Sequence, residues 1–358
     1  MLMATFEEEL FEQPEALEKT LDYYINQSDV LQEARDRFHF SGINHITFAG
    51  MGSSLFSCFI AQNYISKRGY EVDLRDAGEL LFQLPQKYPP TSLIVLVSQS
   101  GESGEIVKLI EKFRGMREPP ALWAITNSRE STLAQNASLI FPTLAGEETS
   151  VTSKTYVATL LVQFLLSSAL VATIFDLNAL QALAAPVAEH AWALLGASGE
   201  TLMGMMDHLG TDFTSLYFIG QECSMATACQ AALNFQEVCR VPAQALSAGQ
   251  FRHGPIEVVD ENFRGILLNG ARETAPLTED LASSISQKWG GGKVVVLSNS
   301  APSGDQDSNI YYASQPISNE YLAPIGEIIP IQRFMVEQAK ARGILTPGEF
   351  RNTTKVTK

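Results

Sequence analysis

The 358-residue sequence predicts an α/β protein made of two tandem modules, each a doubly wound parallel sheet flanked by helices. Short apolar runs that end in small residues alternate with helical stretches, which is typical of parallel strands joined by crossover helices. The same motifs occur again in the second half of the chain. Apolar residues make up 45% of the sequence, which is enough to form a packed core and excludes intrinsic disorder.

The elements follow in order along the chain. Residues 1–40 are acidic and helical in pattern, unlike a signal or transit peptide. In the first module, residues 41–180, the runs 45–49, 93–97 and 121–125 are too short for helices and rich in β-branched or aromatic residues, so they predict strands. Residues 155–175 lack charges, but small polar residues at every fourth position favour a buried helix over a membrane span.

An internal repeat defines the second module. Residues 48–54 (FAGMGSS) align with 218–224 (FIGQECS) at an offset of 170, and 98–103 (SQSGES) with 269–274 (NGARET) at 171. Residues 77–79 match 248–250 at 171, and 126–128 match 298–300 at 172. We therefore expect a second module over residues 211–345, a helical linker over 181–210 and a C-terminal tail over 346–358.

Charge and composition exclude several classes of protein. Twenty-five Lys and Arg against 40 Asp and Glu give a net charge of −15, which argues against a nucleic-acid partner. The four cysteines form no CxxC pair, which is typical of a reduced, cytoplasmic protein. The sequence shows no metal-ligand spacing and no glycine-rich nucleotide loop, so we expect no metal, no cofactor and no membrane association.

Two serine-rich loops are candidates for binding a phosphate. Ser98, Gln99, Ser100 and Ser103 follow one predicted strand, and Ser53 and Ser54 follow another. Loops at the carboxyl ends of parallel strands offer unpaired N–H groups at helix N-termini, and serine adds neutral donors. An acidic protein is then able to bind one phosphate without a basic patch. The alternative is that these serines only cap the helices that follow.

These motifs resemble a known family. GMGSS, SQSGE and residues 247–255 (SAGQFRHGP) are similar to the sugar isomerase (SIS) fold, which is flavodoxin-like, and to the double-SIS isomerase domain of glucosamine-6-phosphate synthase and the fructosamine 6-phosphate deglycases. The resemblance runs from about residue 42 to 355. It implies a phosphate site at Ser98, Gln99, Ser100 and Ser103, and sugar contacts from Ser54 and the turn Val151-Thr152-Ser153.

The resemblance also implies catalytic residues. Glu237 matches the base that moves a proton between C1 and C2, and His253 matches the histidine that assists ring opening from across a homodimer interface. Lys355 matches a lysine that closes over the sugar and forms a Schiff base. Taken without the family, Glu237 is better explained as a surface glutamate, His253 as a structural histidine and Lys355 as part of a solvated tail.

Two departures from the synthase bear on the reaction. The chain begins at Met1 with no room for a glutaminase domain, so we do not expect glutamine-dependent amidotransfer. Asn234 stands where the synthase has a lysine, and in lacking this lysine the chain resembles the deglycases. Lys355, in contrast, matches the lysine of the synthase tail, which the deglycases lack.

We therefore predict a phosphosugar isomerase or deglycase acting on an amino-sugar or fructosamine 6-phosphate. The alternatives are a glucosamine-6-phosphate deaminase, an ammonia-dependent synthase-like aldose-ketose isomerase, and a sensor that binds a phosphosugar without catalysis.

Overall fold

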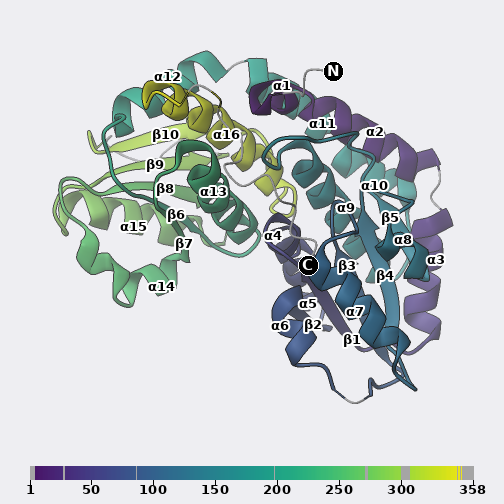
Figure 1. Cartoon of the computed structure of the whole chain (residues 1–358). Coiled ribbons are helices and arrows are strands. Elements are labelled where there is room, and N and C mark those ends of the chain that lie inside the picture. The colour runs from purple at the N-terminus through teal and green to yellow at the C-terminus, as the bar shows by residue number, and fades with distance from the viewer. Residues whose placement is uncertain are drawn as a thin grey trace. The chain divides into compact units, whose positions relative to one another are not determined.

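A computed structural model of the chain describes residues 5–26, 29–85, 87–196, 198–270, 273–299 and 307–344, with 346 and 348. Two compact units are present. The β1–β5 unit comprises residues 15–147 and 154–185, and the β6–β10 unit comprises 1–14, 148–153 and 186–350 as far as they are described. Each unit contains one five-stranded parallel sheet, which confirms the predicted fold class (Figure 1).

The sheet of the β1–β5 unit has the order β2-β1-β3-β4-β5. Its strands are β1 (His45–Gly50), β2 (Glu71–Asp76), β3 (Ser92–Val97), β4 (Ala121–Thr126) and β5 (Leu139–Pro142). The helices of this part of the chain are α2 (Gln13–Asn26), α3 (Asp29–Phe40), α4 (Ser53–Ser57), α5 (Phe59–Ser66), α6 (Ala77–Phe82), α7 (Gly104–Arg114), α8 (Thr132–Asn136), α9 (Lys154–Leu170) and α10 (Leu177–Ala184). Buried residues of α6, α7 and α8 form a core with β1, β3 and β4, and α3 and α5 pack against α9.

Helix α9 accounts for most of the long uncharged segment. All 17 of its residues are buried, so its apolar side chains face protein on every side. Among the described residues, no helix is long and apolar enough to cross a membrane. The interpretation of this segment as a buried helix is confirmed.

The sheet of the β6–β10 unit has the order β10-β9-β8-β6-β7. Its strands are β6 (Leu216–Gly220), β7 (Ala243–Ser247), β8 (Arg264–Asn269), β9 (Lys293–Ser298) and β10 (Ile310–Ser314). The helices are α1 (Phe6–Phe11), α11 (Pro186–Gly196), α12 (Ser198–Leu209), α13 (Ser224–Cys239), α14 (Ala248–Arg252), the 3-10 helix η1 (Pro255–Val258), α15 (Ala275–Gln287) and α16 (Ala323–Ala341). Helices α14 and α15 form a core with β6, β8 and β9, and α13 packs against α16.

The two sheets have the same connectivity, which explains the sequence repeat. The first strand of each module, β1 or β6, pairs with the second and third strands on its two sides. The repeated Ala-Gly pair begins α6 after β2 and α14 after β7. Asp76 and Ser247 cap these helices by accepting hydrogen bonds from Glu79 N at 3.0 Å and Gln250 N at 3.2 Å.

Candidate active site

The carboxyl edge of the first sheet brings the two serine-rich loops together. β1 and β3 are adjacent, with Ala49 opposite Leu96, although the chain leaves them toward different sides of the sheet. Such a reversal of strand order is where open α/β sheets bind ligands. Gly50 fits here because a Cβ on it would lie 2.9 Å from the carbonyl oxygen of Val97. The loops that begin at residues 51 and 98 therefore start side by side.

The loop over residues 98–103 has a defined backbone. Ser98 is buried, and its Oγ accepts a hydrogen bond from Gly101 N at 3.1 Å, while Ser100 Oγ accepts one from Glu102 N at 3.2 Å. Gly101 has φ +65°, and a Cβ on it would lie 2.2 Å from Ser131 Oγ, so only glycine fits. The loop is thus held in one conformation before any ligand binds.

The end of this loop is suited to an anion. Ser103 precedes the 11-residue helix α7, and within the described structure its side chain makes no capping hydrogen bond. The interpretation of this serine as a helix cap is wrong for its side chain, whose hydroxyl stays available beside the positive end of the helix dipole. The nearby Glu102 carboxylate is turned toward α8, where it accepts hydrogen bonds from Thr132 N at 2.5 Å and Thr132 Oγ1 at 2.9 Å.

The loop after β1 supplies Ser53 and Ser54, which open the short helix α4 and are half-buried. The carbonyl oxygen of Ser54 accepts hydrogen bonds from Ser57 Oγ at 2.7 Å and Cys58 Sγ at 3.2 Å, which fixes the backbone of α4. Ser53, Ser54, Ser98, Gln99, Ser100 and Ser103 thus all lie at one edge of one sheet.

The turn over residues 151–153 belongs to the β6–β10 unit, where two carboxylates hold it. Val151 and Ser153 are fully buried, and Glu148 accepts hydrogen bonds from Ser153 N at 2.8 Å and Ser153 Oγ at 3.2 Å. The buried Glu9 of α1 accepts hydrogen bonds from Thr149 N at 2.6 Å and from Ser150 N at 3.2 Å, as well as from both hydroxyls. Sequence reasoning missed Glu9, because no local pattern links residues about 140 positions apart.

Glu237 lies in the last turns of α13 and is half-buried. Its Oε2 accepts a hydrogen bond from Asn234 Nδ2 at 3.3 Å, and Asn234 Oδ1 accepts one from Gln230 Nε2 at 3.0 Å. Both amides are fully buried, so they fix the carboxyl group from one side. Burial raises the pKa of Glu237 above its ordinary value, and the hydrogen bond from Asn234 lowers it by less. A raised carboxyl pKa is what a general base working near neutral pH needs.

His253 ends α14 and is exposed, and no hydrogen bond to its ring is found in the described part of the chain. Glu237 lies near the start of β7, since the adjacent Gln236 donates to the Ala243 carbonyl oxygen at 3.2 Å. His253 follows the end of β7, and the five residues of that strand span roughly 13 Å. Glu237 and His253 therefore lie toward opposite edges of their own sheet, and this unit does not bring them together.

Lys355 and the tail from residue 349 onward lie outside the described residues. Of the predicted site residues, the serine loops share the β1–β5 unit, while Val151, Ser153, Glu237 and His253 share the β6–β10 unit. No group of three or more His, Cys, Asp and Glu side chains that could hold a metal ion is found in the described ranges.

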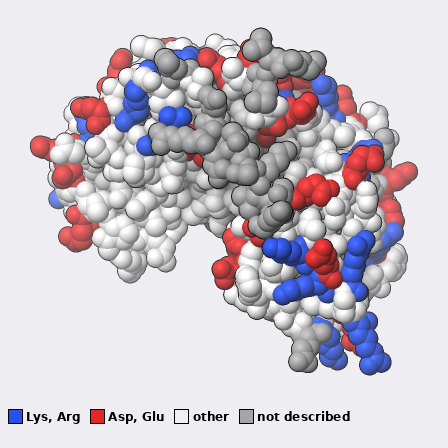
Figure 2. All heavy atoms as spheres, viewed as in Figure 1, with Lys and Arg blue, Asp and Glu red and all other residues white. Residues whose placement is uncertain are grey.

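The charged side chains are unevenly distributed on the face of the molecule that Figure 2 shows. Figure 2 shows acidic side chains over much of the visible face and several basic side chains gathered over the part of the view that holds α5 and α7, while the surface over β7 and α14 is largely uncharged. The donors that the loop over residues 98–103 itself offers to a phosphate are neutral hydroxyls and backbone N–H groups.

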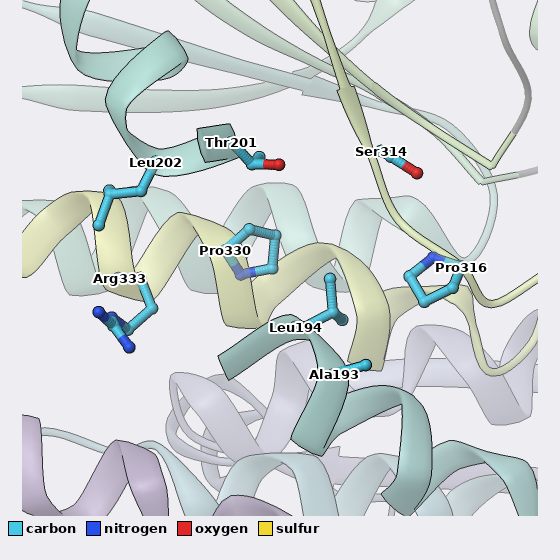
Figure 3. A pocket seen from close by; sticks show the side chains of 8 residues that line it. All are labelled: Ala193, Leu194, Thr201, Leu202, Ser314, Pro316, Pro330 and Arg333. Carbon is cyan, nitrogen blue, oxygen red and sulfur yellow. The ribbon is translucent and has the colours of Figure 1, made fainter. Parts of the chain in front are cut away.

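A separate cavity of about 190 Å³ lies in the β6–β10 unit between α11, α12, β10 and α16 (Figure 3). It is mostly apolar, and the guanidinium group of Arg333 at its edge donates a hydrogen bond to the Leu195 carbonyl oxygen at 3.2 Å. None of its lining residues belongs to the predicted site.

A second functional candidate that sequence reasoning missed is Glu327 on α16, which is fully buried. It accepts hydrogen bonds from Ser224 Oγ at 2.7 Å and Thr227 Oγ1 at 2.6 Å. Burial raises its pKa to about 7, against smaller lowering effects of these two hydrogen bonds. A strong pKa shift of this kind singles the residue out, although structural residues also show it.

Comparisons with known proteins show what this chain is similar to. Residues 39–171 match the family model described as SIS domain. The glutamine–fructose-6-phosphate aminotransferase (isomerizing) of Rhizobium leguminosarum bv. viciae is 26% identical over 94% of this chain and 56% of its own length. The chain thus spans just over half the length of such relatives.

Solved structures show the same fold. The C-terminal domain of glucosamine-fructose-6-phosphate aminotransferase from Francisella tularensis superposes with a TM-score of 0.82, at 20% identity, over 97% of this chain and 99% of that one. Tagatose-6-phosphate ketose/aldose isomerase from Escherichia coli superposes with a TM-score of 0.77, at 19% identity, over 98% and 95%. The predicted resemblance to SIS phosphosugar enzymes is confirmed.

Proposed function

We propose that this chain, which carries a SIS domain at residues 39–171, is a phosphosugar isomerase or deglycase acting on an amino-sugar or fructosamine 6-phosphate. The observation that carries the proposal is the environment of Glu237, a half-buried carboxyl group with a raised pKa, fixed by the amide of Asn234. A carboxyl group in this state is suited to take a proton from carbon and return it.

The substrate is held through its phosphate. Ser98, Gln99, Ser100 and Ser103 bind the phosphate oxygens with hydroxyl and N–H donors, and Ser53 and Ser54 complete the cradle. Val151 and Ser153 contact the sugar. Because the phosphate is remote from C1 and C2, its binding energy serves to hold the open-chain sugar in a reactive geometry.

The reaction is a proton transfer between neighbouring carbons. With a fructosamine 6-phosphate, Glu237 removes a proton from C1 to form an enamine and returns it to C2, which leaves a C1–N imine. Water then adds to C1 and the C1–N bond breaks, giving an aldose 6-phosphate and the free amine. With a substrate that lacks the amine, the same transfer is an aldose-ketose isomerisation.

His253 assists ring opening from a second copy of the chain. The positions of Glu237 and His253 toward opposite edges of one sheet support this assembly, because a single unit does not place both beside one sugar. A homodimer with sites at its interface follows, and Lys355 is the candidate Schiff-base former.

Turnover assays test the proposal. Purified protein is incubated with glucosamine 6-phosphate, a fructosamine 6-phosphate and fructose 6-phosphate with ammonia. Glu237→Gln is expected to lower kcat about 10²- to 10⁴-fold with little change in KM, whereas Glu189→Gln, an exposed glutamate of α11, leaves both unchanged.

The result also separates the alternatives. Amine release from a fructosamine 6-phosphate identifies a deglycase, and turnover that needs ammonia and Lys355 identifies a synthase-like isomerase. Calorimetric binding of a sugar phosphate without turnover of any substrate would sink the enzyme proposal in favour of a sensor.

A further inference from the structure

The second module reverses its strand order at β6 and β8 as the first does at β1 and β3, and we call the place outside the carboxyl ends of β6 and β8 the second crevice. β6 and β8 are adjacent in their sheet as β1 and β3 are in theirs. The repeat offset of 170 puts Ser224 at the position of Ser54, and the offset of 171 puts Gly270 at that of Gln99. Ser224 and Gly270 therefore mark the place in the second module that corresponds to the serine loops of the first.

The second crevice is filled by a side chain of the protein itself. Glu327 is fully buried, and its two carboxyl oxygens accept hydrogen bonds from Ser224 Oγ at 2.7 Å and Thr227 Oγ1 at 2.6 Å. A Cβ on Gly270 would lie 2.5 Å from Glu327 Oε1. The carboxyl group thus occupies the space that a side chain at the position of Gln99 would enter.

The helices α9 and α16, which follow the last strand of each sheet, carry different residues at one aligned position. Gln163 in α9 and Gln332 in α16 are both fully buried and lie 169 residues apart. At the same offset, Ala158 of α9 corresponds to Glu327 of α16. The aligned position thus carries a methyl group in the first module and a carboxyl group in the second, where a Cβ on Gly270 would meet that carboxyl group.

Two polar side chains in the loops after β6 and β8 are also buried without a partner. Asn269, at the position of Ser98, is 4% exposed, and neither its Oδ1 nor its Nδ2 has a hydrogen-bond partner in the described structure. Gln221 Nε2, in the loop after β6, is likewise buried without a partner. Buried polar groups without a partner are costly, so the surroundings of Glu327 are not those of a plain apolar core.

We propose that Glu327 is an internal ligand, whose carboxyl group fills the ligand crevice of the second module in place of an external anion. The inference goes beyond the proposed function and does not rest on turnover. The hydroxyls of Ser224 and Thr227 hold this carboxyl group in the second crevice, and the crevice is therefore closed to phosphosugars.

Chemical rescue by acetate tests the proposal. Glu327→Ala removes a methylene carbon and a carboxyl group, which are the atoms that acetate supplies. The Tm of Glu327→Ala is expected to fall. At pH 5, where part of the acetate is the neutral acid that a buried site favours, acetate is expected to raise this Tm by about 3 °C or more relative to sodium chloride at the same pH and ionic strength, because a ligand that binds the folded state stabilises it. The wild-type Tm should show no such difference.

Ile328→Ala is the matched control, since Ile328 is the next residue of α16, is also fully buried, and leaves an apolar cavity. Equal acetate effects on the two variants would overturn the proposal. If Glu327→Ala does not fold in chloride, it is refolded in acetate. Recovery of the native circular dichroism in acetate alone supports the proposal, and failure in both salts while Ile328→Ala folds overturns it.

Discussion

Replacing Glu327 with glutamine should remove a pH dependence of stability that this one residue causes. Burial raises the pKa of Glu327 to about 7 in the folded protein, against 4.5 as the ordinary value expected in the unfolded chain. Its neighbours Ser224 and Thr227 are neutral hydroxyls, and among the described residues no charged group contributes to the pKa shift. The cost of ionising a buried carboxyl group therefore falls on the folded state alone.

The sign and size follow from proton linkage. Because the pKa is raised on folding, the contribution of Glu327 to stability is fully present below about pH 4.5 and is lost as the pH rises through about 7. The loss amounts to about 3 kcal/mol by pH 8.5, of which about 2.5 kcal/mol falls between pH 5 and pH 8.5. Glutamine has the same shape and no proton to lose, so Glu327→Gln lacks this loss.

The assay is the free energy of unfolding of wild type and Glu327→Gln in urea at several values from pH 5 to pH 8.5. Groups that both proteins share cancel in the difference between them, which leaves the titration of Glu327. The amide changes the hydrogen bonds to Ser224 and Thr227 by an amount that does not vary with pH, so the slope and not the offset is diagnostic. A difference that stays constant across this range would refute the reasoning, whichever protein is the more stable.

Three further predictions concern the candidate site. Gly101→Ala, with its Cβ 2.2 Å from Ser131 Oγ at φ +65°, should cost roughly 2–4 kcal/mol of stability and weaken sugar-phosphate binding measured by calorimetry. Gly69→Ala, at φ +87° with nothing within 4 Å, should cost about 1 kcal/mol and leave binding intact, and equal effects would contradict the role of the loop. Glu9→Gln should cost roughly 1–3 kcal/mol, since an amide nitrogen cannot accept from the donors of residues 149 and 150, and should speed hydrogen exchange of those amides; unchanged exchange would argue against the clamp. The kcat/KM of wild type should fall on the acid side at a pH above 4.5, because burial raises the pKa of Glu237, and this limb should be absent from the residual activity of Glu237→Gln; a limb that survives belongs to another group.

The central strands were predictable from the sequence because they are buried on both faces. β3 is buried at every position, so its residues form a continuous apolar run that a local pattern detects. β2, an edge strand with the sequence EVDLRD, is largely solvent-accessible and has no such run, so it was missed. The internal repeat was predictable because residues such as Gly50 stand where two backbones approach closely, which constrains the same positions in both modules.

Local motifs in the sequence mark the candidate site residues, but they do not mark the contacts that hold those residues in place. The serine loops carry a local motif, whereas the hydrogen bonds of Glu9 to residues 149 and 150 and of Glu327 to Ser224 join positions more than 100 residues apart. No periodicity or spacing encodes such contacts, since they depend on how helices pack in three dimensions. The orientation of Glu237 by Asn234 is intermediate, because a spacing of three residues on one helix predicts contact only once the helix itself is known.

The Glu327 carboxyl group is not the only group that closes the second crevice. A substitution at Glu327 therefore opens only part of it. A Cβ on Gly270 would also lie 2.9 Å from Ala323 Cβ and 2.9 Å from Ser224 Oγ. The first turn of α16 therefore lies against the loop after β8 independently of Glu327. Removing the carboxyl group leaves a space of its own size but does not move α16. Glu327→Ala should for this reason accept acetate and exclude a sugar phosphate, and a second phosphosugar bound per chain in this variant would show that Glu327 alone had kept the crevice closed.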